Sequence, residues 1–114
     1  MAVRRIANRD ASWYTTRRLP FVGSNLYAKE LRDPYRYVVY SYGGHWPLYV
    51  WDGGVQRWFV NGDVFSRTTS RHKTQACPDM KGESALVVGV QYIKELMFGG
   101  YVRFIKERLN GLHS

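Results

Sequence analysis

The centre of this chain holds three runs of β-branched and aromatic residues that are separated by glycine pairs. The runs cover residues 36–42, 47–51 and 56–60. Gly43-Gly44 and Gly53-Gly54 interrupt them, and glycine supplies the positive φ that tight hairpin turns require. Such side chains favour strands, and short connections favour antiparallel pairing. The sequence therefore predicts an antiparallel β-meander of three strands, which a short strand at residues 64–66 would extend to four.

The C-terminal third changes to a helical pattern. Its apolar residues recur at intervals of three and four, from Leu86 to Leu109, and Ser84 fits an N-cap. Gly99-Gly100 would divide this stretch into two helices or kink one, because glycine weakens a helix interior. We therefore expect an α+β fold, in which a small antiparallel β-meander of three to four strands precedes one kinked or two C-terminal helices.

The N-terminal third carries weaker signals. Residues 1–12 are basic and offer little to pack, so we expect a flexible arm there and a single α+β domain over residues 13–114. A short strand is predicted at residues 13–17. One helical turn is predicted at residues 25–31, ended by Asp33-Pro34, because the residue before a proline disfavours helix.

The composition narrows the class of protein. The formal net charge is +8, and the surplus lies in residues 1–36 and 57–81. A basic excess favours nucleic acid, an anionic membrane surface or an acidic protein as partner, and argues against an acidic mimic of DNA. The single Cys77 excludes an internal disulfide, so a reducing cytoplasm is the simplest compartment. The sequence predicts neither a signal peptide nor a membrane span.

Ser66–Gln75 is the most distinctive polar stretch. Every side chain in it is polar, and none is a carboxylate. Such a run offers many donors to a phosphate or another anion. Alternatively, its hydroxyls bond the local backbone and cap a short helix. The candidate anion-binding residues are Arg67, Thr69, Ser70, Arg71, His72 and Lys73, assisted by Arg17 and Arg18.

The aromatic residues allow two interpretations. The chain has four Trp, nine Tyr and five Phe, and many of them fall in the predicted sheet. Exposed rings beside cations can stack on the bases of a single strand, and Trp46, Tyr49 and Trp51 are the candidates for stacking or partner contact. Alternatively, these rings form the core of a small domain.

Two histidines raise the question of catalysis. His45 and His72 could act as acid and base in metal-independent phosphodiester cleavage if they faced each other. A metal pair would need a third ligand, for which Asp63 is the nearest candidate. Structural histidines are commoner, so we expect a protein that is not an enzyme and has no cofactor or metal.

Four segments carry a resemblance to a known family. They contain Tyr-Ser-Tyr-Gly at 40–43, His-Trp-Pro at 45–47, Trp-Phe-Val-Asn at 58–61 and Ser-Arg-Thr-Thr-Ser-Arg-His-Lys-Thr-Gln at 66–75. Over residues 37–78 this pattern resembles an uncharacterised domain in small proteins of tailed bacteriophages and prophages. The resemblance implies a viral or prophage origin, hence the cytoplasm of a bacterial host, and little chemistry.

These observations lead to three expectations. The first is a small basic phage-type accessory protein that binds nucleic acid without catalysis. The second is a protein-binding module that inhibits a host enzyme or defence complex, of the anti-CRISPR or anti-restriction type, with aromatic residues as hot spots. The third is a phosphodiesterase that uses the two histidines. A homodimer through the C-terminal helix is a further alternative to core packing of that helix.

Overall fold

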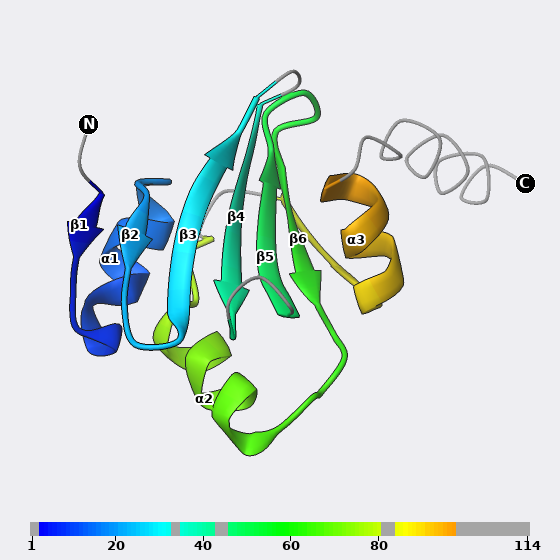
Figure 1. Cartoon of the computed structure of the whole chain (residues 1–114). Helices are drawn as coiled ribbons and strands as arrows, with labels where there is room; N and C mark the ends of the chain where they lie inside the picture. Colours follow the sequence, from blue (N-terminus) through cyan, green and yellow to red (C-terminus); the bar gives the residue numbers. More distant parts are fainter. Residues whose placement is uncertain (1–2, 33–34, 43–45, 81–83, 98–114) are drawn as a thin grey trace, which may run out of the picture.

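Seven strands form one mixed sheet in the computed structural model (Figure 1), which describes residues 3–32, 35–42, 46–80 and 84–97. The strands are β1 (Arg4–Arg5), β2 (Phe21–Val22), β3 (Leu26–Leu31), β4 (Arg36–Ser41), β5 (Trp46–Asp52), β6 (Arg57–Asn61) and β7 (Ser84–Val88). The helices are the 3₁₀ helix η1 (Asn8–Asp10), α1 (Ala11–Thr16), α2 (Arg67–Gln75) and α3 (Val90–Met97).

The strands lie side by side in chain order. Neighbours from β2 to β6 are antiparallel, whereas β1 runs parallel to β2 and β6 runs parallel to β7. Parallel neighbours need a crossover connection, which η1 with α1 supplies at one edge and α2 at the other. The prediction of a small meander followed by C-terminal helices is therefore wrong. The three central runs are strands, but they form the middle of a larger mixed sheet.

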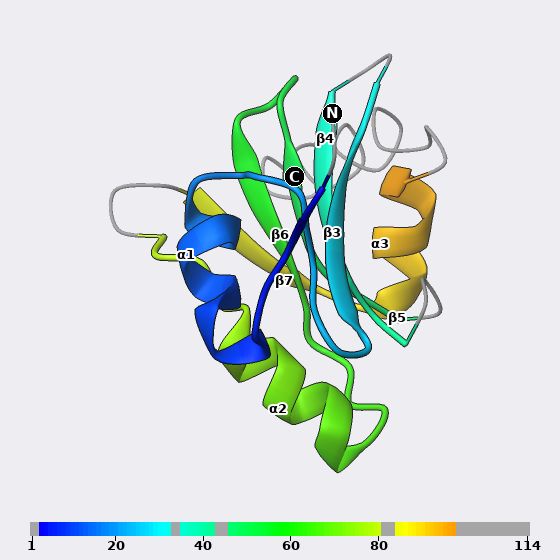
Figure 2. The same ribbon diagram turned by 60° about the vertical axis from the view of Figure 1, so that its left-hand side comes forward.

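Helices cover both faces of this sheet. Figure 2 shows α1 and α2 on one face and α3 on the other. Because alternate residues of a strand face opposite sides, strands covered twice must be apolar on both faces. This explains the nearly continuous runs of β4, β5 and β6. The core beneath α1 and α2 includes Phe21, Leu26, Tyr37, Val39, Leu48, Tyr49, Trp51 and Trp58, and the core beneath α3 includes Val38, Tyr40, Val50, Phe59, Ile93 and Leu96.

The N-terminal third differs from its prediction. Residues 13–17, expected as a strand, belong mostly to α1, because Ala11 and Thr15 are buried one helical turn apart. Residues 25–31, expected as a helical turn, belong mostly to β3, which pairs with β4 along its whole length.

The expected flexible arm over residues 1–12 contains β1, η1 and the start of α1. The Asn8 side chain fixes this segment to the turn before β3. Its Nδ2 donates to the Ser24 carbonyl at 2.9 Å, and its Oδ1 accepts from the Ser24 amide at 2.8 Å. The described part of this segment is therefore integral to the domain.

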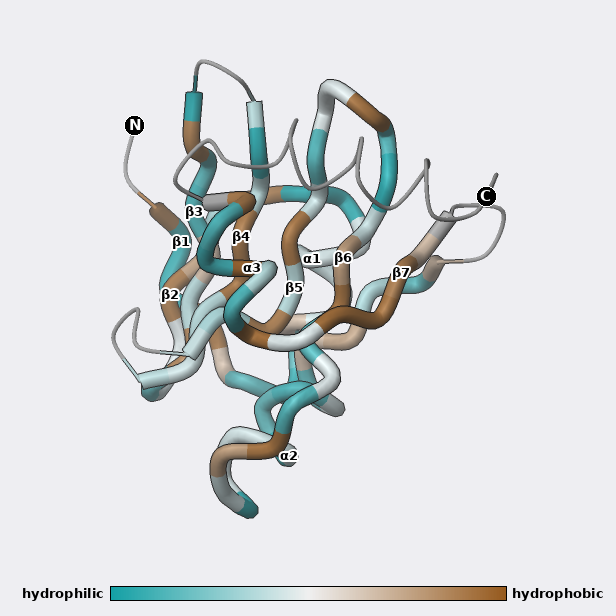
Figure 3. Tube along the Cα trace, turned by 90° about the vertical axis from the view of Figure 1, so that its right-hand side faces the viewer, coloured by the Kyte–Doolittle hydropathy of each residue, from teal (hydrophilic) through white to brown (hydrophobic). Residues whose placement is uncertain are grey.

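The helix expected over residues 84–109 begins later. Residues 84–88 form the strand β7, because the β-branched end of this run pairs with β6. The apolar character of β7 is visible in Figure 3. The helix α3 follows, and Ile93 and Leu96 are buried against the sheet. The break at Gly99-Gly100 and the part of the stretch considered for a homodimer that follows Met97 lie outside the described residues. Residues 64–66 are not a strand.

A further observation concerns membranes. Within the described ranges, we find no helix that has both the length and the apolar composition of a membrane span.

Candidate functional site

The polar run Ser66–Gln75 is a helix rather than a loop. Ser66 is the N-cap of α2, and its Oγ accepts a hydrogen bond from the Thr69 amide at 3.1 Å. The Thr69 Oγ1 in turn accepts from the Ser66 amide at 2.9 Å, which completes a capping box. Thr69 is therefore a structural residue whose hydroxyl is committed to the cap, and not the ligand donor that we expected.

His72 lies on the buried face of α2. Its side chain is only 5 % exposed, and its Nδ1 lies 2.7 Å from the Oγ of Ser41, at the end of β4. The ring also lies against Tyr42. Burial lowers the pKa of His72, and the neighbouring Arg71 lowers it further. His72 thus holds the helix to the sheet and does not face an external ligand.

The opposite face of α2 presents cations to solvent. Arg67 and Arg71 are exposed and stand four positions apart, so their side chains leave the same side of the helix. Neither forms an ion pair with a described residue, and α2 contains no acidic side chain. The exposed hydroxyls of Ser70 and Thr74 flank them. We call Arg67, Ser70, Arg71 and Thr74 the α2 cationic face.

The segment η1 extends this surface. It lies against α2 and carries the exposed Arg9. The Ser12 Oγ donates to the Cys77 carbonyl at 2.5 Å, and the Asp79 amide donates to Thr16 Oγ1 at 2.8 Å. Because these bonds tie α1 to the chain that follows α2, the two helices form one connected layer.

Arg17 and Arg18 do not join the α2 cationic face. They follow α1 at the end away from α2, where the Arg17 guanidinium lies 4.0 Å from the centre of the Trp13 ring. The Arg18 guanidinium lies 4.3 Å from the centre of the Trp51 ring, at the end of β5 opposite to Trp46. The expectation that both arginines assist the polar run is not supported by this arrangement.

The three predicted stacking residues have different surroundings. Tyr49 is buried, and its hydroxyl donates to the Lys73 carbonyl at 2.7 Å. Tyr49 therefore joins the sheet to α2. Burial also raises the pKa of Tyr49. Trp51 is buried too, because Arg18 and the Trp58 ring cover it. Of the three, Trp46 alone is partly exposed.

Phe65 is a surface residue that the sequence analysis missed. Its side chain is 65 % exposed, and its ring centre lies 5.1 Å from that of Trp46. Val64 beside it is 79 % exposed. The sequence shows only that this apolar pair stands between two polar stretches, and it does not show whether the pair is buried or exposed.

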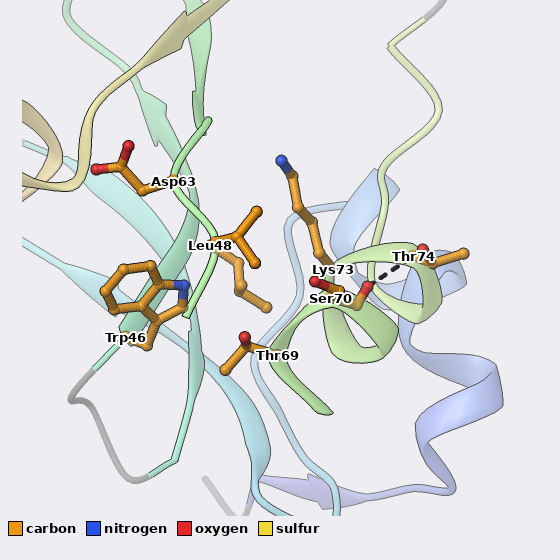
Figure 4. Close-up of a pocket in the computed structure, with 8 residues that line it drawn as sticks. Trp46, Leu48, Asp63, Thr69, Ser70, Lys73 and Thr74 are labelled. Atoms are coloured by element: carbon orange, nitrogen blue, oxygen red, sulfur yellow. Dashed lines mark hydrogen bonds between the residues drawn. The ribbon is translucent and has the colours of Figure 1, made fainter. Parts of the chain in front are cut away.

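A pocket of about 230 Å³ opens between this segment and α2 (Figure 4). Trp46, Leu48, Asp63 and Val64 line one side, and Thr69, Ser70, Lys73 and Thr74 line the other. In Figure 4, Lys73 extends from the helix, and Asp63 lies across from it. The pocket is therefore lined by the aromatic residue Trp46 and by Lys73, whereas the Asp63 carboxylate points away from Lys73. We call it the α2 pocket.

Asp63 also has a structural contact. Its Oδ2 accepts a hydrogen bond from the Val90 amide at 2.9 Å, at the start of α3. This position suits a carboxylate, because the N-terminus of a helix carries partial positive charge. Asp63 is not part of a metal centre in the described residues, since these contain no cluster of three or more potential ligands.

The proposed histidine pair cannot be placed. His45 lies outside the described residues, and the His72 Nδ1 contacts Ser41. Cys77 is exposed and free, and its thiol lies 3.6 Å from the neighbouring Pro78 carbonyl oxygen. The described residues thus bring together cations and an aromatic pocket rather than an acid–base pair.

No match to this chain was found among protein-family models, curated proteins or solved structures. The resemblance to a domain of tailed-phage proteins therefore stays a prediction.

Proposed function

We propose that this chain is a small accessory protein that binds nucleic acid, without catalysis, through the α2 cationic face. The observation that carries the proposal is the pair Arg67 and Arg71, exposed one helical turn apart without a described carboxylate partner. Unpaired guanidinium groups side by side are suited to phosphate oxygens, because each can form charge-assisted, bidentate hydrogen bonds.

The surroundings of this pair support the proposal. Ser70 offers an exposed hydroxyl on the same face, and Arg9 adds a cation from the adjoining η1. Hydroxyls and cations of this kind make most contacts to a nucleic-acid backbone and carry no base information. The net charge of +8 adds a long-range attraction to any polyanion.

The proposal contains no catalytic step. A histidine that serves as a general base must reach the proton that it removes. The His72 ring is instead buried against the sheet, with Nδ1 at the Ser41 hydroxyl. The resemblance over residues 37–78 supports a phage or prophage source, and the cytoplasm of the bacterial host is then the proposed compartment.

Fluorescence anisotropy with a labelled oligonucleotide at about 50 mM salt tests the proposal. The double variant R67A/R71A is expected to bind at least about tenfold more weakly, because a hydrogen bond to a charged group contributes about 1.5–3 kcal/mol. R17A is the matched control, since it removes an exposed arginine at the far end of α1. Absence of binding by the native chain, or equal affinity of R67A/R71A, would contradict the proposal.

One observation favours a second candidate function. Val64, Phe65 and Val87 are large apolar residues with more than half of their side-chain surface exposed. Exposed apolar side chains near an aromatic residue such as Trp46 are typical of a protein-binding hot spot. The chain could then inhibit a host enzyme or a defence complex. A stoichiometric protein partner that survives nuclease treatment, and that F65A fails to capture, would favour this function over the first.

A further inference from the structure

We propose that the outer edge of β7 is an interface between two copies of this chain, in which β7 pairs with β7 in antiparallel order about a two-fold axis. This edge is separate from the α2 cationic face, and the pairing does not depend on the proposed function. The joined sheet would continue from one copy into the other.

The two margins of the sheet differ in length and charge. The strand β1 has two residues, Arg4 and Arg5, and both are exposed. Like charges that face each other across a strand pair are destabilising, so this short cationic edge opposes the addition of a second strand. The strand β7, at the other margin of the sheet in Figure 3, has five residues, none of which is charged. It therefore lacks both features that protect β1 from pairing.

The backbone of β7 is open on its outer side. The Val88 carbonyl accepts from the Gly62 amide at 2.8 Å, so the backbone groups of Val88, and of Leu86 two residues before it, point toward β6. The amide and carbonyl groups of Ala85 and Val87 then point away from β6, where no described strand pairs with β7. A further strand would form its hydrogen bonds with these groups.

The side chains of β7 favour a second copy of the same strand as the partner. Val88 is buried and Leu86 is half-buried on the side of α3, so Ala85 and Val87 lie on the other face of the strand. Val87 is 63 % exposed, and a neighbouring strand would remove part of this apolar surface from water. Because β7 carries no charge that would select an acidic or a basic peptide, an uncharged β-branched strand such as β7 itself suits this edge.

An antiparallel register centred on Leu86 satisfies all the open groups. Ala85 of one copy then lies opposite Val87 of the other, and the two residues exchange both of their hydrogen bonds. The two-fold axis repeats this pair, so the interface is self-complementary. Leu86 faces Leu86 of the second copy in a non-hydrogen-bonded pair. Since the axis is perpendicular to the sheet, the helix α2 of both copies lies on the same side of the joined sheet.

The size and charge of the contact predict a weak dimer. Five strand residues per copy are far fewer than the roughly 20–30 residues on each side of a standard interface. Each copy carries a net charge of +8, so salt should strengthen the dimer because it screens the repulsion between copies. Salt weakens nucleic-acid binding instead. Failure of this interface is therefore distinguishable from failure of the proposed function.

Sedimentation velocity of the chain without nucleic acid, at increasing protein concentration, tests the pairing. The native protein should shift from the monomer mass toward the dimer mass. V87K places a cation on the edge and should remain monomeric where the native protein dimerises. V64K adds the same charge at an exposed valine outside β7 and should dimerise like the native protein. A native chain that stays monomeric, or a dimer that V87K retains, would overturn the interface.

Cysteine cross-linking tests the register independently of V87K. The native thiol is first removed by C77S, because Cys77 is exposed and free. L86C should then form an intermolecular disulfide on oxidation, since the Cα atoms of a non-hydrogen-bonded pair lie about 4.5 Å apart. V87C should cross-link far more slowly although position 87 is the more exposed, because the two thiol-bearing residues would lie roughly 8–9 Å apart. Faster cross-linking of V87C than of L86C, on a non-reducing gel, would overturn the proposed pairing.

Discussion

The Nδ1 atom of His72 lies 2.7 Å from the Oγ atom of Ser41, and this contact joins the middle of α2 to the end of β4. It determines which side of the helix faces the sheet. With His72 turned inward, Arg67 and Arg71 point to solvent, because they lie about 140° and about 100° around the helix axis from His72. The orientation of the α2 cationic face therefore depends on a buried polar contact.

The first prediction concerns pH. Burial lowers the pKa of His72 in the folded protein below the ordinary value of 6.5, so the unfolded chain binds the proton first as the pH falls. The contribution of neutral His72 to stability is then present above pH 6.5 and is lost as the pH falls through the lowered pKa. We expect the free energy of unfolding, measured by urea denaturation, to decrease between pH 7 and pH 5.

The variant H72N is the control for this dependence. An asparagine amide can reach the Ser41 hydroxyl but does not titrate. Its stability should therefore change less between pH 7 and pH 5 than that of the native protein. Parallel pH profiles for the two proteins would show that His72 is not the titrating group.

The second prediction concerns the start of α2. S66A removes the N-cap hydroxyl that accepts from the Thr69 amide and should lower the free energy of unfolding by about 1 kcal/mol. T68A, at an exposed position within the same helix, should change it little. Equal stabilities of S66A and T68A in chemical denaturation would argue against the capping box.

The third prediction concerns the N-terminal segment. N8A removes both hydrogen bonds between Asn8 and Ser24, each of which contributes about 0.5–1.5 kcal/mol. We expect N8A to be destabilised in thermal or urea unfolding. N8D, which keeps the acceptor for the Ser24 amide, should be intermediate. A free arm would instead leave both variants as stable as the native protein.

The fourth prediction concerns the buried side chain of Asn61. Asn61 is fully buried, and its Nδ2 donates to the Pro47 carbonyl at 2.7 Å while its Oδ1 accepts from the Asp63 amide at 2.9 Å. It thus holds Asp63 near the strand that carries Trp46. N61A should cost about 1–3 kcal/mol, because it leaves buried polar groups without a partner.

Urea denaturation followed by circular dichroism measures this loss of stability. An N61A protein with native stability would contradict the role that these two hydrogen bonds suggest.

Some of the fold could be predicted from local sequence. The strands β4, β5 and β6 coincide closely with three β-branched and aromatic runs, because strands buried on both faces need such residues along their whole length. The helix α1 could not be predicted in this way. Its Trp13 and Thr15 favour strands, and the burial of Thr15 against the sheet overrides this local preference.

Pairing between distant segments explains the error at the C-terminal end. Leu86, Val90 and Ile93 have helical spacing. Leu86 nevertheless belongs to the strand β7, where it pairs with Phe59 of β6. That pairing joins residues far apart in sequence, and the local hydrophobic periodicity does not indicate it.

The candidate site could also be predicted only where it depends on residues close together in sequence. The capping pair of Ser66 and Thr69 was visible as one interpretation of the polar run, whereas the burial of His72 depends on Ser41 in a different strand. Arg67 and Arg71, two of the candidate anion-binding residues, are exposed. Phe65 was overlooked because a single aromatic residue in a polar context does not reveal whether it is buried.

The salt dependence of binding tests the central claim most directly. For native protein and for R67A/R71A, the logarithm of the association constant for single-stranded DNA is measured against the logarithm of salt concentration. If both arginines neutralise phosphates, the slope of the double variant should be shallower by about 1.4, because each neutralised phosphate of a single strand contributes about 0.7. R17A should keep the native slope. Identical slopes for the native protein and R67A/R71A would contradict the assignment of the α2 cationic face.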